Sequence, residues 1–264
     1  MLELKDVVKV FYPGTVNEKV ALNGLNLKLE EGDFVTVIGG NGAGKSTMLN
    51  AICGVWPIDD GKVIIDGKDV TALPEYKRAA FLGRVFQDPM TGTAATMGID
   101  ENLAMAARRG EKRGLRWGIT KEEREKYYEL VKSLDLGLEN RLTSKVGLLS
   151  GGQRQAITLL MASLKRPKVL LLDEHTAALD PKTAAKVLEA TQRIVEKDNL
   201  TTMMITHNMR DAIAYGNRLV MMYDGHIVVD VSGEEKKHLT VEQLLNLFSQ
   251  ASGSDEADDK LLLS

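Results

Sequence analysis

The feature that most constrains the fold of this chain is the glycine-rich segment Gly39-Gly40-Asn41-Gly42-Ala43-Gly44-Lys45-Ser46. It follows an apolar run, Phe34–Ile38, in which Thr36 is the one polar residue, and precedes a predicted helix over Thr47–Ile52. Apolar runs of this length are typical of parallel strands that are covered on both faces, and Val169–Leu172 is a second such run. Glycines allow the backbone to curl so that successive N–H groups face an anion, and the following helix N-terminus adds positive potential. The sequence therefore predicts an α/β core with a strand–loop–helix unit that can bind phosphate.

The same segment matches the P-loop pattern, and a strand before it and a helix after it are the context that this pattern requires. Lys45 is expected to bind the β- and γ-phosphates of a nucleotide, and Ser46 to ligate Mg²⁺. The alternative is an ordinary glycine-rich turn, which is disfavoured because such a match rarely arises by chance. The nucleotide-binding residues expected here are Gly39, Gly40, Asn41, Gly42, Ala43, Gly44, Lys45, Ser46 and Thr47.

The composition excludes several other classes of protein. A formal net charge of −3 gives no global positive field, so we expect no nucleic-acid partner. No stretch approaches the roughly 18 to 20 apolar residues that cross a bilayer, and the N-terminus does not resemble a signal peptide. The single cysteine, Cys53, favours a reducing compartment. Residues 1–38 alternate in the manner of half-buried strands and predict an antiparallel element.

A pair of carboxylates, Asp173 and Glu174, follows the apolar run Val169–Leu172. The C-terminal edge of a parallel strand is where a metal-bound nucleotide can meet side chains, and the segment resembles a Walker B motif. Asp173 is expected to hold Mg²⁺ through its water shell, and Glu174 to face the γ-phosphate as a general base or water-orienting group. Without the glycine loop upstream, a simple acidic turn would be the better interpretation.

The segment Leu149-Ser150-Gly151-Gly152-Gln153-Arg154 opens a second predicted helix, and a serine N-cap followed by two glycines forms another anion cradle. It resembles the signature motif of ABC-type ATPases, and the resemblance extends over residues 1 to about 248 in the family's order. It implies that Ser150, Gly151, Gly152 and Gln153 face the γ-phosphate of ATP bound on another subunit, so that two chains enclose two nucleotides. A capped helix without a ligand is the alternative.

Further segments match the family in order, although each is weak when taken alone. The resemblance implies that Gln87 contacts Mg²⁺ and the attacking water, that Asp180 crosses to the partner subunit, and that His207 contacts the γ-phosphate. It also implies an aromatic platform for adenine, for which Phe11 fits best and Tyr12 is the alternative.

The chain departs from the family at His175, where proline is usual after the two carboxylates. A histidine beside a phosphate site could titrate or bind a metal. The preferred interpretation is a tolerated substitution that leaves the turn less rigid.

The resemblance implies a P-loop NTPase fold of the ABC nucleotide-binding type. It comprises a RecA-like core, an N-terminal antiparallel β-subdomain and a helical subdomain at about residues 88–166. Thr120 and Glu123 predict a helix start with a capping box. A basic stretch over residues 108–117 could touch headgroups or a partner, but a solvated helix end is the simpler interpretation. Residues 249–264 are acidic and low in complexity, and we expect a disordered tail there.

The function implied is that of an ATPase subunit, using ATP and Mg²⁺, bound to permease subunits at the cytoplasmic face of the membrane and acting as a homodimer. The unusual segment Asp173-Glu174-His175-Thr176-Ala177-Ala178-Leu179-Asp180 is similar to ATPase subunits found with lipoprotein-type substrate-binding proteins. This favours import of a small solute, with an amino-acid-like molecule as the candidate. Alternatives are the ATPase of an exporter or of a lipid- or lipoprotein-moving system, and a soluble ABC ATPase that acts on ribosomes or DNA. The last class usually carries two such domains or long coiled coils, and neither feature is visible.

Overall fold

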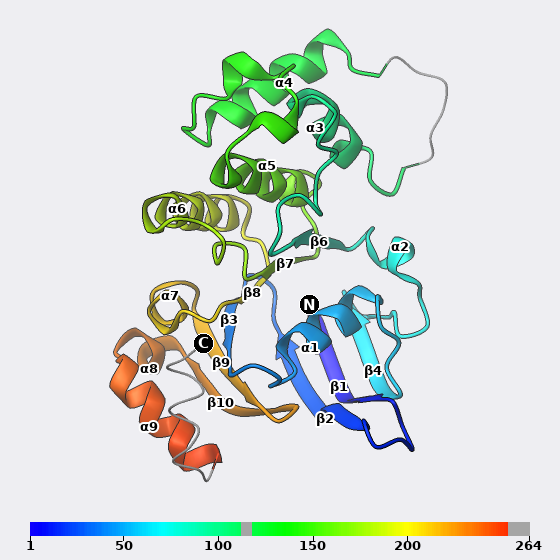
Figure 1. The fold of residues 1–264 in the computed structure, drawn as a ribbon, viewed down its shortest axis with the longest axis vertical. Helices are drawn as coiled ribbons and strands as arrows, with labels where there is room; N and C mark the ends of the chain where they lie inside the picture. Colours follow the sequence, from blue (N-terminus) through cyan, green and yellow to red (C-terminus); the bar gives the residue numbers. More distant parts are fainter. Residues whose placement is uncertain (112–117, 253–264) are drawn as a thin grey trace.

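The computed structural model describes residues 1–111 and 118–252 and shows an elongated molecule built on two sheets (Figure 1). The larger sheet has six strands in the order β10-β9-β3-β8-β7-β6. Its parallel strands are β3 (Phe34–Ile38), β6 (Leu82–Val85), β7 (Val169–Asp173), β8 (Thr202–Ile205) and β9 (Arg218–Tyr223), and β10 (His226–Ser232) runs antiparallel to β9. The predicted α/β class is confirmed, and both apolar runs, Phe34–Ile38 and Val169–Leu172, lie in parallel strands of this sheet.

Strand β7 shows why its apolar run is unbroken. Val169 and Leu171 point into the core shared with the smaller sheet, whereas Leu170 and Leu172 point into the core shared with the helices on the opposite face. All four are fully buried. Because successive side chains of a strand face opposite sides, a strand with a hydrophobic core on each side must be apolar at every position.

The smaller sheet is antiparallel and has the order β2-β1-β4-β5. The prediction of an antiparallel element over residues 1–38 is confirmed for β1 and β2, whereas Phe34–Ile38 forms a parallel strand of the larger sheet. Its strands are β1 (Leu2–Phe11), β2 (Lys19–Leu29), β4 (Asp60–Ile65) and β5 (Lys68–Asp69). Leu4 lies opposite Leu27, and both are buried. The helix α1 (Lys45–Cys53) lies in the core between the two sheets, where Met48 and Ile52 pack against strands of both. The short helix α2 (Glu75–Arg78) precedes β6.

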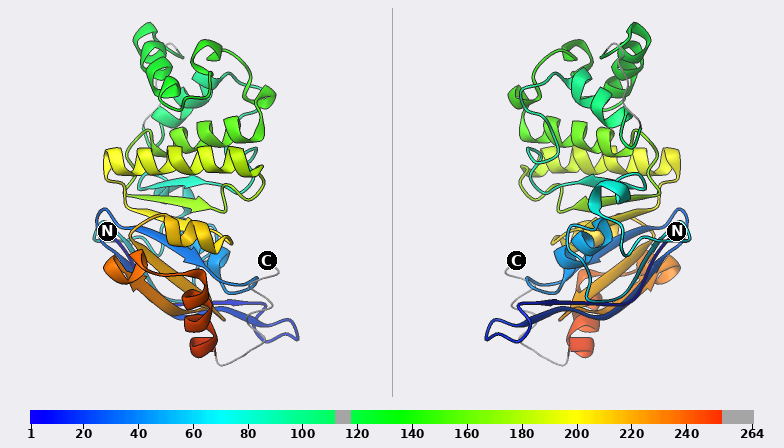
Figure 2. Two further views of the ribbon diagram at one scale, coloured as in Figure 1. Left: turned by 90° about the vertical axis from the view of Figure 1, so that its left-hand side faces the viewer. Right: turned by 90° about the vertical axis from the view of Figure 1, so that its right-hand side faces the viewer.

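A helical part covers the other face of the larger sheet and forms the upper half of the molecule in Figures 1 and 2. It contains α3 (Ile99–Ala107), α4 (Lys121–Lys132), the 3₁₀ turns η1 (Glu139–Arg141) and η2 (Val146–Leu148), and α5 (Gly151–Ser163), which packs on α6 (Pro181–Asp198). The predicted capping box at Thr120 is confirmed, because its hydroxyl accepts from Glu123 N while the Glu123 carboxylate accepts from Thr120 N. Of the basic stretch, Arg108 pairs with Glu123 at 2.9 Å, and residues 112–117 lie outside the described part of the chain.

The C-terminal helices α7 (Met209–Ala214), α8 (Gly233–Lys237) and α9 (Val241–Ser252) pack beside β9 and β10. Helix α9 runs four residues past position 248, so the start of the expected disordered tail is helical. Its buried Leu244 and Phe248 anchor it to the sheet, and the helix continues for one further turn. The rest of the tail, residues 253–264, lies outside the described part. No helix among the described residues combines the length and apolar character needed to cross a membrane.

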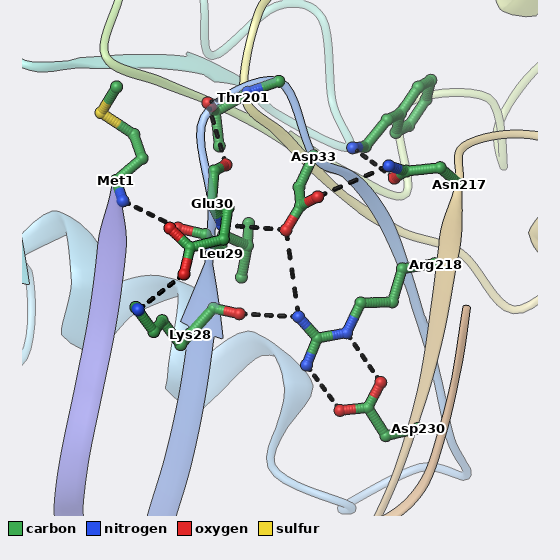
Figure 3. Close-up of polar contacts among 11 residues, drawn as sticks. Met1, Lys28, Leu29, Glu30, Asp33, Thr201, Asn217, Arg218 and Asp230 are labelled. Carbon is green, nitrogen blue, oxygen red and sulfur yellow. Dashed lines mark hydrogen bonds and ion pairs between the residues drawn. The ribbon is translucent and has the colours of Figure 1, made fainter. Parts of the chain in front are cut away.

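A polar network ties the two sheets together where β2 ends and β3 begins (Figure 3). Arg218, at the start of β9, donates to Lys28 O at 2.7 Å and makes two bonds to the Asp230 carboxylate at 2.7 and 2.5 Å. Its guanidinium also lies 4.0 Å from Asp33, which receives a 3.4 Å bond from Asn217. The glycine loop follows the opposite end of β3, so this network joins the two sheets at the end of the strand that is remote from the loop.

Candidate nucleotide site

The glycine loop joins β3 to α1 and is shaped by close contacts that only glycine permits. A Cβ on Gly39 would lie 2.3 Å from Met222 O, and one on Gly44 would lie 2.6 Å from Ala21 O. Both residues have positive φ, 151° and 102°. Gly44 caps α1 without a side-chain hydrogen bond, so the amides of the first turn are not covered by a capping side chain. The loop therefore fits the phosphate groups of a nucleotide.

Lys45 folds back into this loop. Its ammonium donates to Gly39 O at 2.5 Å and to Gly40 O at 3.1 Å, and the residue is buried. Burial lowers the pKa of Lys45, while the nearby carboxylates of Glu174 and Asp173 act to raise it. A buried ammonium that donates to carbonyl oxygens has a strong preference for a phosphate oxyanion.

The carboxylates and the histidine predicted from sequence meet at the C-terminal edge of the sheet. Asp173 ends β7 and pairs with Ile205 in β8, which places Glu174 and His207 on neighbouring strand ends. Their side chains are 3.9 Å apart, from His207 Nδ1 to Glu174 Oε2. Glu174 has a positive φ of 42°, and its amide donates to Ile205 O at 3.0 Å. A non-glycine residue in this region carries backbone strain of the kind concentrated at functional sites.

Gln87 leaves the same edge of the sheet. Val85 of β6 lies opposite Leu172 of β7 in a parallel ladder. Gln87 follows Val85 by two residues and Glu174 follows Leu172 by two residues, so both leave the sheet at the same level. The Gln87 side chain is exposed. One edge of the sheet therefore brings together five predicted site residues that span more than 160 positions of the sequence. They are Lys45, Gln87, Asp173, Glu174 and His207.

Sequence reasoning missed Arg84, which lies on β6. Its guanidinium contacts Asp173 Oδ2 at 3.2 Å and Asn50 Oδ1 at 3.0 Å, and stacks on the Phe86 ring with 4.6 Å to the centroid. Arg84 thus connects the expected metal-binding carboxylate, the helix after the glycine loop and the segment that leads to Gln87. A signal was available, because Arg84 is the one charged residue in the run Phe81–Phe86.

His175 is a structural residue in this fold. It is 2% exposed, and its Nε2 lies 3.1 Å from Thr191 Oγ1 on α6. Since that hydroxyl donates to Val187 O at 2.8 Å, it accepts from His175, which fixes the proton on Nε2. Burial lowers the pKa of His175 to about 4, so the ring is neutral near pH 7. The buried ring therefore supplies no titrating group to the phosphate site. It also anchors the turn to α6, whereas the substitution was expected to leave the turn less rigid.

The second cradle, Ser150–Gln153, begins α5 in the helical part. Ser150 Oγ accepts from Gln153 N at 3.3 Å, and Gln153 Oε1 accepts from Ser150 N at 3.2 Å. Gly152 packs so closely on α6 that an added Cβ would lie 1.9 Å from Thr183. Among the described residues, no hydrogen bond or ion pair joins this cradle to the glycine loop or to Glu174. One chain therefore does not bring the two cradles into polar contact with each other.

The remaining predicted residues lie around these cradles. Asp180 is the N-cap of α6, and its carboxylate accepts from Thr183 N at 3.1 Å. Phe11, at the end of β1, packs edge-on against Trp56 with 5.1 Å between ring centroids. Tyr12 has a positive φ and is 68% exposed. Both aromatic residues thus stay available as the adenine platform.

Three features together define an ATPase of the ABC class. They are a glycine loop at the end of a parallel strand, a strained acid beside a histidine, and a separate serine–glycine cradle on the helical part. Comparisons with known proteins agree. A family model described as "ABC transporter" matches residues 22–177. The chain belongs to this family and is an ATP-binding subunit that hydrolyses ATP.

Several relatives cover nearly the whole chain. The "Tyrosine transport ATP-binding protein" of Clostridioides difficile is 44% identical over 251 residues, covering 95% of this chain and 100% of the relative. The "Phosphonates import ATP-binding protein PhnC" of Lactobacillus gasseri is 30% identical, with 97% of both chains covered.

Solved structures show the same fold. The dimeric ATP-binding cassette MJ0796, in a post-hydrolysis state with ADP and Pi, matches with a TM-score of 0.75 and 31% identity, over 88% of this chain and 98% of that one. The ADP conformation of the cassette MJ1267 gives a TM-score of 0.76 at 26% identity, over 99% and 98% of the two chains. The fold is therefore that of an ABC nucleotide-binding cassette, and ATPase subunits of this family dimerise and work with transmembrane permeases.

Proposed function

We propose that this chain energises the import of a small amino-acid-like solute, as a homodimer that binds Mg-ATP beneath permease subunits at the cytoplasmic face of the membrane. The observation that carries the ATPase part is the meeting of Lys45, Asp173, Glu174 and His207 at one sheet edge. Import is supported by relatives named for the transport of tyrosine and the import of phosphonates and methionine. The 44% identity favours tyrosine or a similar amino acid, delivered by an extracytoplasmic substrate-binding protein.

In this proposal Lys45 exchanges the carbonyls of Gly39 and Gly40 for the β- and γ-phosphates, because an oxyanion satisfies its charge better than amide dipoles do. Ser46, Gln87 and Asp173 would hold Mg²⁺, which neutralises charge on the phosphate oxygens. The proposed donor set of hydroxyl, amide and carboxylate oxygens suits that ion. In the structure Asp173 forms an ion pair with Arg84, with 3.2 Å between Asp173 Oδ2 and the guanidinium.

Glu174 orients the attacking water and takes up its proton, and His207 contacts the γ-phosphate from the neighbouring strand end. The 3.9 Å separation of the two side chains supports this division of roles, because a single water or phosphate oxygen could contact both. Phe11, or Tyr12 in its place, stacks on adenine. The cradle Ser150–Gln153 and Asp180 serve the nucleotide of the other subunit, since the described part of one chain shows no polar contact between the cradle and the glycine loop.

A groove of about 410 Å³ is the proposed docking place for a permease segment. It lies between β6, α3 and α5 and is lined by Arg84, Phe86, Met105, Arg109 and Thr158, among others. Arg84 reaches from this groove to Asp173, and Phe86 directly precedes Gln87. A segment that fills the groove would thus contact the residues next to the proposed metal ligands.

The substitution Glu174→Gln tests the catalytic assignment, because it keeps the size of the side chain and removes the carboxylate. We expect ATP affinity within about twofold of wild type, turnover reduced by about 100-fold or more, and an ATP-dependent dimer on size-exclusion chromatography. Glu189→Gln, an exposed acid on α6, is the matched control and should change none of these. Normal turnover in Glu174→Gln would refute the assignment.

Transport is tested by co-expressing the chain with its permease and measuring uptake of labelled tyrosine into cells. Uptake should be lost in Glu174→Gln and competed by related amino acids. Uptake of a phosphonate but not of tyrosine would show that the proposed amino-acid substrate is wrong. Efflux of tyrosine would show that the proposed direction of transport is wrong.

A further inference from the structure

Lys19 stands at the rim of the glycine loop without belonging to any motif. It is the first residue of β2, exposed, and pairs with Phe11 across the β1–β2 ladder. Its ammonium reaches back over the loop, because Lys19 Nζ lies 3.1 Å from the position that a Cβ on Gly42 would occupy. Lys19 is therefore a second cation beside the loop whose interior holds Lys45.

The other lysines of strands β1 and β2, which are Lys5, Lys9 and Lys28, all have carboxylate partners, and Lys19 differs from them. Lys9 pairs with Asp59 at 3.1 Å, and Lys28, near the far end of β2, pairs with Glu30 at 2.6 Å. Within the described ranges of the chain, no carboxylate lies within ion-pair distance of Lys19. The charge at the loop rim is thus not neutralised by any carboxylate that the structure describes.

The position of Lys19 between two other features identifies the kind of ligand. On one side is Phe11, the proposed adenine platform, which is its cross-strand partner. On the other side is Gly42, in the middle of the loop that cradles the terminal phosphates. A nucleotide that uses both features must pass its ribose and inner phosphates between them. An ammonium at that point meets an oxyanion and can donate to it.

We infer that Lys19 is a nucleotide-binding residue that contacts the phosphate chain of ATP from outside the loop. This inference rests on the proposed nucleotide site and adds a contact that the family's motifs do not contain. Lys19 contributes affinity for every nucleotide with a phosphate chain and none for the nucleoside. Its effect falls with rising salt, because the side chain is exposed and its charge is screened.

The test is nucleotide binding by Lys19→Met, measured without turnover. A fluorescent ATP analogue reports direct affinity, and unlabelled ATP, ADP and adenosine compete with it at low and high salt. We expect affinity for ATP and ADP to fall about three- to tenfold at low salt, with less loss at high salt, and affinity for adenosine to stay unchanged. Lys19→Arg should recover most of the loss. Lys28→Met removes an equivalent lysine from the same strand and should have no effect.

The outcomes separate this inference from the site itself. If Lys45→Ala abolishes ATP binding while Lys19→Met binds ATP as wild type does, the nucleotide site stands and the Lys19 inference is overturned. Equal losses for ATP and adenosine would also overturn it, since they indicate a damaged strand. If the wild-type chain binds ATP no better than adenosine, both proposals fall.

Discussion

At the scale of single residues, the site depends on side chains that are buried and hydrogen-bonded, although several of them lie in turns. His175 shows this most clearly. A proline at this position would hold the turn through its ring, whereas the imidazole does so by donating to Thr191 on α6. The connection joins the strand end that carries Glu174 to the helix that begins at Asp180.

His175 also makes the stability of the fold depend on pH. Burial lowers its pKa from 6.5 to about 4, so the folded chain keeps the ring neutral under conditions in which the unfolded chain protonates it. This contribution is complete above about pH 6.5 and is lost as the pH falls from there towards 4. Between pH 7 and pH 5 we expect it to lower the free energy of unfolding by about 2 kcal/mol.

The variant His175→Leu should show this in urea denaturation at both pH values. At pH 7 it is expected to be less stable by about 1 to 2 kcal/mol, because Thr191 loses its donor. Between pH 7 and pH 5, the free energy of unfolding of the variant should fall by about 2 kcal/mol less than that of wild type. Equal losses in both proteins would show that the ring titrates in the folded chain.

At the scale of elements, the helix α1 that follows the glycine loop is held at its far end by Arg78 from α2. This buried guanidinium donates to Ala51 O and Ile52 O in the last turn of α1, and to Leu73 O and Thr71 O in the preceding loop, at 2.7 to 3.0 Å. Helix C-termini leave carbonyls without partners, and a cation there also suits the helix dipole. Arg78 thus orients α1, and with it the loop at its N-terminus.

Replacement of this residue by Arg78→Met should lower the free energy of unfolding by about 3 kcal/mol, because several buried carbonyls lose their donor at once. The neighbouring exposed residue supplies the control, and Lys77→Met should change stability by less than about 0.5 kcal/mol. Thermal and urea denaturation measure both. An Arg78→Met chain as stable as the control would show that water replaces the guanidinium.

At the scale of the whole molecule, the two cradles lie on different parts of the chain. The glycine loop belongs to the core between the sheets, whereas Ser150–Gln153 belongs to the helical part. The cassette MJ0796 is dimeric with ADP and Pi bound. The proposed homodimer would bring the second cradle of each chain to the nucleotide of the other.

A pair of matched cap variants tests this arrangement. Ser150 and Thr120 both cap a helix through a capping box, so Ser150→Ala and Thr120→Ala should each lower stability by about 1 kcal/mol. Only Ser150→Ala should weaken the ATP-dependent dimer, by about tenfold in the Glu174→Gln background, while leaving the ATP affinity of the monomer unchanged. Dilution series on size-exclusion chromatography measure the dimer. Identical dimers in the two variants would remove Ser150 from the interface.

The sequence by itself determined the features that depend on residues close together in the chain. The glycine loop, the capping box at Thr120, the serine N-cap at Ser150 and the unbroken apolar run Val169–Leu172 are recognisable because backbone dihedrals and strand faces follow from local residue order. The tertiary structure alone decided which distant residues meet. Arg84 reaches Asp173, His175 reaches Thr191, and Lys19 reaches the glycine loop. Such contacts depend on strand order and register, which no local pattern specifies, because any of several parallel orders would bury the same apolar runs.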